Sequence, residues 1–203
     1  MDKAAETDEP AGDALRADLK VLANSLKLNG SRNLAGGRLR RLMRGVQIFG
    51  FHLAPIDLRQ NSEVHARSVA ELLAGAGRCP DYEALSEIER ISLLTAEIAT
   101  PRPLYSPYLS YSEETEGELA IFFAARELRA KYGAAALPNC IISKTDGVSD
   151  LLELALLLKE SGLLLPGYGG QTRPQLNVNI IPLFETIEDL EAATLADVVA
   201  FHA

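Results

Sequence analysis

The chain of 203 residues is long enough for one domain with a hydrophobic core, or for part of a larger domain. Its formal net charge of −8 argues against a nucleic-acid surface, which needs excess positive charge, and no apolar run approaches the roughly 20 residues of a membrane span. Cys79 and Cys140 have no His or Cys neighbour at metal-binding spacing, so we expect two free thiols and a cytoplasmic location.

Residues 1–12 are rich in acidic side chains and are expected to form a disordered tail. In chain order, the predicted elements after it are helices over 13–28 and 35–49, a strand over 51–58, helices over 63–74, 87–100 and 113–132, a strand over 137–143, a helix over 149–161, a strand over 176–184, and helices beginning at 187 and 194.

Local signals set several of these boundaries. Ser86 and Glu89 have the spacing of a capping box, and Pro101 ends the helix that follows. Asn61 or Ser62 is expected to cap the helix over 63–74, Ser112 the helix over 113–132, and Ser149 the leucine-rich helix. That last helix carries too many leucines for a single buried stripe, so we expect it to be buried on more than one side.

The three strands are apolar, rich in β-branched residues and separated by helices, a pattern typical of a parallel sheet. Three such strands alone would leave sheet edges exposed, whereas a closed (β/α)8 barrel has eight strands. We therefore expect a helix-rich α/β fold in which residues 13–203 form an incomplete segment of a single domain. That segment is a partial TIM-type barrel with about three parallel strands and additional helices.

Polar side chains follow two of these strands. Arg59 and Gln60 close the run that begins at residue 51, and Glu185 closes the run that ends in Pro182–Leu183–Phe184. Because α/β barrels hold their active sites at the carboxyl ends of their strands, these side chains are candidates for a site. A cation and a carboxylate together suit a phosphorylated or carboxylated substrate and a divalent metal ion.

Each candidate also has a purely structural interpretation. Arg59 can form an ion pair with Asp57 or with a neighbouring acid, and Glu185 can be a carboxylate favoured at a helix start. His65 is interpreted as a packing or capping histidine. The one basic cluster that we identify, Arg38, Arg40, Arg41 and Arg44, is interpreted as a solvated helix face.

Several short motifs occur in a definite order. They are Phe49–Gly50, Ile56–Asp57–Leu58–Arg59–Gln60, Ser62 with His65, Pro101–Arg102–Pro103–Leu104, Ile141–Ile142–Ser143, Ser149–Asp150–Leu151–Leu152, Leu157–Leu158–Lys159–Glu160 and Pro182–Leu183–Phe184–Glu185–Thr186. Their order and spacing from about residue 15 to the end resemble the central region of the bacterial-type phosphoenolpyruvate carboxylase family.

The resemblance implies a large, mostly helical enzyme built around an eight-stranded barrel, usually a homotetramer in the cytoplasm. It implies the reaction of phosphoenolpyruvate with bicarbonate to give oxaloacetate and phosphate, with Mg²⁺ or Mn²⁺ and no organic cofactor. No nucleic-acid or membrane partner is expected.

The resemblance also implies roles for individual residues. Glu185 matches a carboxylate ligand of the divalent metal, and Arg59 matches an arginine that contacts substrate. Gln60 is a weaker candidate for orienting substrate or Arg59, and Ser143 can present its hydroxyl to the pocket. Lys144 replaces an apolar residue of many relatives and serves either substrate electrostatics or a surface salt bridge.

Other parts of the family's active site do not occur in these 203 residues. The catalytic histidine of the family lies upstream of this region, and a second metal carboxylate, in a Gly-Tyr-Ser-Asp-Ser motif, lies downstream. We therefore expect this segment alone to be inactive. The alternative is a free-standing, non-catalytic module that binds a small anion or a protein partner.

Overall fold

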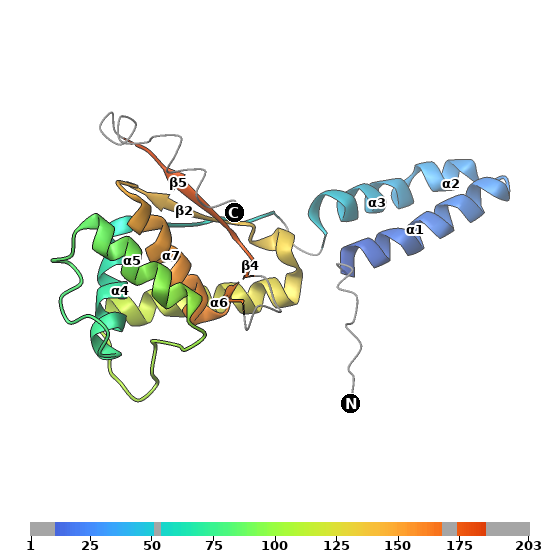
Figure 1. Cartoon of the computed structure of the whole chain (residues 1–203). Helices are drawn as coiled ribbons and strands as arrows, with labels where there is room; N and C mark the ends of the chain where they lie inside the picture. The colour runs from blue at the N-terminus through green and yellow to red at the C-terminus, as the bar shows by residue number, and fades with distance from the viewer. Residues whose placement is uncertain (1–10, 51–53, 168–173, 186–203) are drawn as a thin grey trace. The chain divides into compact units, whose positions relative to one another are not determined.

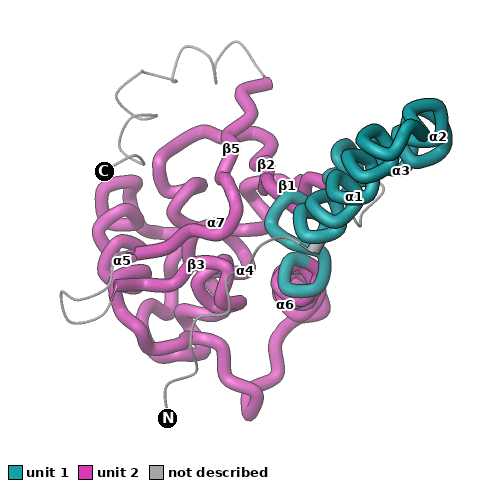
Figure 2. The backbone as a smooth tube through the Cα atoms, turned by 90° about the vertical axis from the view of Figure 1, so that its right-hand side faces the viewer, with its two compact units in different colours: residues 1–55, 129–136 teal, residues 56–128, 137–203 magenta. Residues whose placement is uncertain are grey.

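The computed structural model describes residues 11–50, 54–167 and 174–185 (Figure 1). Contacts between residues divide the chain into two compact units, coloured separately in Figure 2. The first comprises residues 1–55 and 129–136, and the second comprises residues 56–128 and 137–203. The predicted disordered tail lies outside the described residues except for Ala11 and Gly12, which begin the first helix. That residues 13–203 belong to one barrel domain stays a prediction.

The first unit contains the helices α1 (Ala11–Leu28), α2 (Arg32–Gly36) and α3 (Arg38–Phe49), and α1 packs against both others. The prediction of one helix over 35–49 was wrong at its start, because Gly37 separates two helices and caps the second. On α1, Leu19 is buried and Leu22 is 56% exposed. Ala23 is buried instead, and a small side chain there lets the helices approach closely.

The second unit contains a three-stranded sheet of β1 (Leu58–Asn61), β2 (Asn139–Ser143) and β5 (Asn179–Leu183). The order is β1-β2-β5, and both pairings are parallel. This confirms the helix-rich α/β class and the three parallel strands. Four helices accompany the sheet: α4 (Ser62–Gly75), α5 (Glu87–Ala99), α6 (Glu113–Tyr132), which belongs to this unit up to Leu128, and α7 (Val148–Ser161). The short 3-10 turn at Ala134–Ala136 belongs to the first unit.

The first strand begins later than the sequence predicts. Residues 51–53 of the predicted strand over 51–58 lie outside the described residues, and residues 54–57 are not a strand. Pairing with β2 starts only at Leu58, opposite Cys140. Before that point Pro55 has no N–H to donate, and Asp57 accepts a side-chain hydrogen bond from Asn139 at 2.9 Å. Arg59 therefore lies within the strand rather than after it.

The predicted strand over 176–184 is two strands with different partners. Its first part is β4 (Gln175–Leu176), which pairs antiparallel with the short β3 (Leu164–Leu165). Its second part is β5, which pairs parallel with β2. Between them the Asn177 N–H donates to the Leu163 carbonyl at 2.9 Å, so the chain changes partner there. Residues 168–173 and the helices predicted from 187 and 194 lie outside the described residues.

Helix caps explain most of the remaining boundaries. Asn61 caps α4 by accepting from the Glu63 N–H at 3.0 Å, and the Glu89 carboxylate accepts from the Ser86 N–H at 2.8 Å, which confirms that capping pair. Ser112 accepts from the Thr115 N–H at 3.2 Å, as predicted. The expected cap at Ser149 was wrong. Gly147 is the cap residue of α7, and the Ser149 hydroxyl donates to Glu87 at 2.6 Å instead.

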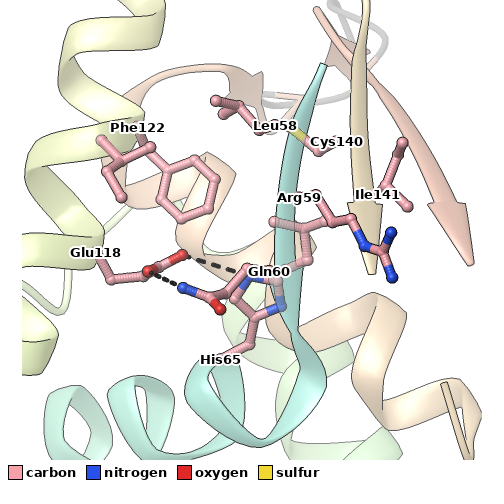
Figure 3. A pocket seen from close by; sticks show the side chains of 10 residues that line it. Leu58, Arg59, Gln60, His65, Glu118, Phe122, Cys140 and Ile141 are labelled. Carbon is pink, nitrogen blue, oxygen red and sulfur yellow. Dashed lines mark hydrogen bonds and ion pairs between the residues drawn. The ribbon is translucent and has the colours of Figure 1, made fainter. Parts of the chain in front are cut away.

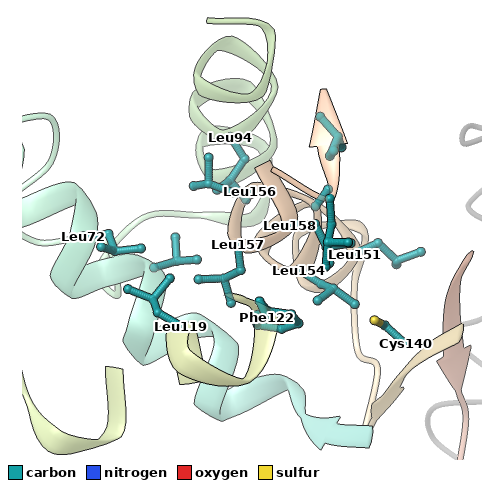
Figure 4. Close-up of a cluster of buried hydrophobic side chains, with 14 of the residues drawn as sticks. Leu72, Leu94, Leu119, Phe122, Cys140, Leu151, Leu154, Leu156, Leu157 and Leu158 are labelled. Carbon is teal, nitrogen blue, oxygen red and sulfur yellow. The ribbon is translucent and has the colours of Figure 1, made fainter. Parts of the chain in front are cut away.

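The core of the second unit lies around α7, which contacts α4, α5 and β5 (Figure 4). Five consecutive residues of this helix, from Leu154 to Leu158, are at most 1% exposed. Leu119 and Phe122 of α6 and Leu94 of α5 belong to the same cluster. This confirms that the leucine-rich helix is buried on more than one side. Neither Cys79 nor Cys140 forms a disulfide within the described residues.

A carboxylic acid is also buried beside this core. Glu153 of α7 is 0% exposed, and its Oε1 accepts a hydrogen bond from the Tyr82 hydroxyl at 2.8 Å. Arg90 lies 3.9 Å from the same oxygen, while Oε2 has no hydrogen-bond partner in the described part of the chain. Burial raises the pKa of Glu153 to about 8, and repulsion from nearby Asp150 acts in the same direction.

The stability of the chain is therefore expected to fall as the pH rises. Above the ordinary pKa of 4.5 the unfolded chain loses this proton, while the folded chain keeps it until about pH 8. The free energy of unfolding should decrease across that window by a few kcal/mol and level off above it. Urea titrations of the chain at pH 5, 6, 7 and 8 measure this slope.

The matched variant is Glu153→Gln, which keeps the shape of the side chain and cannot ionise. In this variant the free energy of unfolding should fall less between pH 6 and 8, and the variant should be more stable than the original chain at pH 8. Asp150, whose pKa is also raised by burial, keeps a smaller contribution of the same sign. Equal slopes in the two proteins would show that Glu153 does not keep its proton.

Candidate functional site

Arg59 contacts two other sequence-predicted site residues in the second unit. It is the second residue of β1, and its Nε donates a hydrogen bond to the Ser143 hydroxyl at 2.7 Å. Its Nη2 donates to Glu185 Oε1 in a short charged hydrogen bond. The structure therefore brings together a cation, a hydroxyl and a carboxylate from three segments that are far apart in the sequence.

The parallel sheet explains why these residues meet. Asn61 pairs with Ser143, and Ser143 pairs with Leu183, so the three strands end at the same edge. Side chains two residues apart share a face of a strand. Arg59 therefore lies on the same face as Asn61 and Ser143, while Glu185 follows β5 by two residues.

This group of residues is partly open to solvent. The side chains of Arg59 and Glu185 are 56% and 36% exposed, respectively. Water screens an ion pair at this exposure, so it contributes little to stability, about 0–1 kcal/mol. A charged pair with so small a structural contribution remains available to an anionic ligand or a cation.

Arg59 forms an ion pair with an acidic side chain, as its structural interpretation predicts. Its acidic partner is Glu185 and not Asp57, whose Oδ1 accepts from the Asn139 side chain. The neighbouring-acid alternative thus describes the contact in this structure. That contact joins the two residues for which the sequence predicts functional roles, and those roles stay predictions.

Gln60 lies on the opposite face of β1, away from Arg59 (Figure 3). Its Nε2 donates to Glu118 Oε2 at 3.0 Å, and its Oε1 accepts from the Asn61 N–H at 2.9 Å. The structure does not bring Gln60 into contact with Arg59, because successive strand residues point to opposite faces. An orienting role for Gln60 would have to act through the strand itself.

His65 and Glu118 form a buried pair beside Gln60. His65 Nε2 lies 3.5 Å from Glu118 Oε1, and both side chains are at most 5% exposed. Neither ring nitrogen of His65 has a hydrogen bond in the described residues, and its ring lies 6.3 Å from that of Phe122. A cavity of about 110 Å³ adjoins these side chains. This burial agrees with the interpretation of His65 as a packing residue.

Glu118 was not predicted from the sequence, although a signal for it exists. Thr115, Leu119 and Phe122 are buried on one face of α6, and a residue three positions from Thr115 shares that face. A helical acid is normally assumed to be solvated. Periodicity alone would have placed Glu118 inward.

Lys144 follows Ser143 in the chain and forms an ion pair with Glu63 of α4. Its ammonium lies 3.6 Å from Glu63 Oε1, and the two side chains are 54% and 64% exposed. This contact favours the surface salt bridge over a role in substrate electrostatics. The other two histidines of the chain, His52 and His202, lie outside the described residues.

The oxygen donors at the strand ends fit part of a site for a hard divalent ion. Glu185 supplies a carboxylate, the ligand that Mg²⁺ and Mn²⁺ prefer, and Mg²⁺ commonly keeps several waters besides one or two carboxylates. Within the described residues, no group of three or more His, Cys, Asp and Glu side chains could hold a metal ion. The role of Glu185 as one ligand of a larger site stays a prediction.

Comparison with known sequences decides the family. The sequence model of the family described as phosphoenolpyruvate carboxylase matches residues 3–199. The chain belongs to the phosphoenolpyruvate carboxylase family. This confirms the resemblance inferred from the colinear motifs.

Several curated proteins with the name phosphoenolpyruvate carboxylase are similar to this chain. The protein from Aromatoleum aromaticum is 64% identical over 179 residues, which cover 88% of this chain and 19% of that protein. The proteins from an Azoarcus species and from Azorhizobium caulinodans are 59% and 55% identical, over 91% and 90% of the chain. The chain spans about a fifth of the length of these relatives.

The chain contains one part of the candidate site and a fraction of the length of its relatives. It carries the Arg59, Ser143 and Glu185 group on a three-stranded sheet, and the relatives extend over about five times its length. No helix in the described ranges is long and apolar enough to cross a membrane.

Proposed function

We propose that this chain is a segment of a phosphoenolpyruvate carboxylase that forms oxaloacetate and phosphate from phosphoenolpyruvate and bicarbonate. The observation that carries the proposal is the contact of Arg59 with Ser143 and Glu185 at the carboxyl edge of a parallel sheet. Family membership supplies the reaction class. The segment alone is proposed to be inactive, because it represents about a fifth of its relatives.

The reaction explains why an arginine belongs at this position. A bicarbonate oxygen attacks the phosphorus, and the bond between phosphorus and the enol oxygen breaks, which leaves carboxyphosphate and an enolate. Carboxyphosphate then releases phosphate and carbon dioxide, and the enolate carbon attacks the carbon dioxide to give oxaloacetate. Negative charge builds up first on phosphoryl oxygens and then on the enolate oxygen, where a preorganised guanidinium stabilises it.

The neighbours of Arg59 prepare the guanidinium for this role. Ser143 accepts from Nε and thereby sets the plane of the guanidinium. Glu185 holds Nη2, and its carboxylate would also hold a magnesium or manganese ion together with residues beyond this segment. When bound, that ion would supply further stabilisation of negative charge.

We further propose that the sheet is part of a (β/α)8 barrel. β1 and β5 are the edge strands of the described sheet, and each edge is able to pair with a further strand. The face with Arg59, Ile141 and Ile181 is partly exposed, which suits a surface that the remaining strands would enclose. A cytoplasmic homotetramer is proposed for the whole enzyme on the basis of the family alone.

A chimera tests the proposed function. The matching segment of the Aromatoleum aromaticum protein is replaced by the corresponding residues of this chain, which are 64% identical. Oxaloacetate formation is then measured with phosphoenolpyruvate, bicarbonate and Mg²⁺, for the chimera and for the isolated chain. We expect turnover by the chimera and background rates for the isolated chain.

Two results would contradict this proposal. A chimera that folds and assembles like its parent but forms no oxaloacetate would show that this segment does not serve that reaction. Turnover by the isolated chain would show that its own residues suffice for catalysis. That result would contradict the expectation that a histidine and a second metal carboxylate from outside this chain are required. Circular dichroism and size-exclusion chromatography establish the folded state in both cases.

A further inference from the structure

The helical first unit carries a charge opposite to that of the rest of the chain. Residues 11–50 contain eight Lys and Arg residues and two Asp residues, a formal charge of +6. The whole chain carries −8, so the residues outside this segment carry −14. Concentrated positive charge in an acidic protein indicates a local function rather than a general surface property.

Most of these cations line one hollow between the three helices. Its volume is about 620 Å³, within the range of small-molecule pockets. The cations at its walls, hereafter the basic groove, are Arg16, Lys20 and Lys27 of α1, Arg32 of α2, and Arg40 and Arg44 of α3. The small residues Ala23, Ala35 and Gly36 also line the hollow and leave room between the helices.

The helical period places these cations on common faces. Arg16, Lys20 and Lys27 follow one another at intervals of four and seven residues, which brings them to one side of α1. Arg40 and Arg44 are four residues apart on α3. Two facing rows of positive charge result, and Arg32 lies on the short helix that joins them.

Side chains of the described residues leave most of this charge without an ion-pair partner. Arg16 lies 3.7 Å from Asp13 in an ion pair within α1. The other five cations form no ion pair with any residue in the described ranges. Like charges held around one hollow repel one another, and an anion bound among them would relieve that repulsion.

We propose that the basic groove binds a small anion that carries several phosphate groups. Guanidinium groups bind phosphate oxygens in a bidentate manner, and three of the groove cations that lack an ion pair are arginines. Cations on opposite walls suit a ligand with charges at more than one position. A long nucleic acid fits less well, because the −14 of the remaining chain would repel it.

The proposal is tested by titrating the full 203-residue chain with inorganic triphosphate in a calorimeter at low ionic strength and at 150 mM salt. The groove variant is Arg40→Gln/Arg44→Gln. The matched control is Arg38→Gln/Arg41→Gln, which removes the same charge from the same helix at exposed positions that do not line the hollow. We expect saturable binding that weakens at least tenfold in the groove variant and less than twofold in the control.

A second variant approaches the groove from the other helix. Lys20→Gln/Lys27→Gln changes exposed side chains of α1, and it should weaken triphosphate binding by a similar factor if both walls contact the ligand. A parallel titration with adenosine triphosphate distinguishes the source of the phosphate groups. Equal affinity points to an inorganic polyphosphate, and tighter binding points to an organic phosphate.

Two results would overturn the proposal. Absence of binding at millimolar triphosphate would mean that the groove is only a solvated surface, which is the structural interpretation of its α3 arginines. Equal weakening in the groove and control variants would mean that triphosphate responds to overall charge and not to a site. Circular dichroism of each variant ensures that a lost signal does not reflect lost helix.

Discussion

Replacing Arg59 with glutamine in the active chimera should lower kcat by a factor of about 100 to 1,000. The amide keeps two polar atoms at the strand but removes the positive charge that we propose to stabilise the phosphoryl and enolate oxygens. Because the side chain is 56% exposed and its ion pair with Glu185 is screened, the stability of the protein should change by less than about 1 kcal/mol. Initial rates of oxaloacetate formation and a urea titration measure the two quantities.

The control for Arg59 is another partly exposed arginine in an ion pair. Arg67 of α4 donates from Nε and Nη2 to the two oxygens of Glu114 at 2.9 and 2.8 Å. Arg67→Gln should leave kcat within a factor of two of the chimera. If both substitutions reduce kcat equally, Arg59 is a structural ion-pair residue and its proposed role is wrong.

Replacing Leu157 with alanine should destabilise the isolated chain by about 3–5 kcal/mol. Leu157 is 0% exposed and lies in the cluster shared by α4, α6 and α7 (Figure 4), where helices close around it from more than one side. The free energy of unfolding combines the lost apolar burial with the cavity left behind. Small domains are stable by only about 5–15 kcal/mol, so the urea midpoint should fall steeply.

A leucine at the edge of the same unit provides the comparison. Leu128 of α6 is 44% exposed, and Leu128→Ala should change the free energy of unfolding by less than about 1 kcal/mol. Similar losses for the two substitutions would indicate that α7 is not the centre of the core. A reduced urea slope for Leu157→Ala would instead indicate that the unit no longer unfolds in one step.

The sequence predicted the helices well because their boundaries depend on local chemistry. The Ser86–Glu89 capping pair and Gly162, which ends α7 at φ +79°, act within a few residues of the chain. Strand limits depend instead on the partner strand, which for β1 lies about 80 residues later in the sequence. For this reason Leu58 begins a strand opposite Cys140 although the apolar run begins at residue 51.

The sequence predicts the candidate site only in part, because the directions of its side chains depend on where the strands begin. The residues Arg59, Ser143 and Glu185 follow from apolar runs that end in polar side chains, and the structure joins them. The direction of Gln60 depends on where β1 starts, and the sequence does not specify that start. The cations of α1 were not predicted to form a site, because they alternate with apolar residues in the sequence. The packing of α1 on α2 and α3 brings them together around one hollow.

The alternation of β1 has a consequence for how this gene can change. Arg59 and Gln60 are neighbours in the chain, yet one contacts Glu185 and the other contacts Glu118 on the far side of the strand. Losing or gaining a single codon within residues 58–61 would exchange the two environments at once. Such an event would direct an arginine toward the buried His65–Glu118 pair and an apolar or amide side chain toward the sheet edge. In members of this family, insertions and deletions should therefore be absent from these four positions and occur in the surface loops instead.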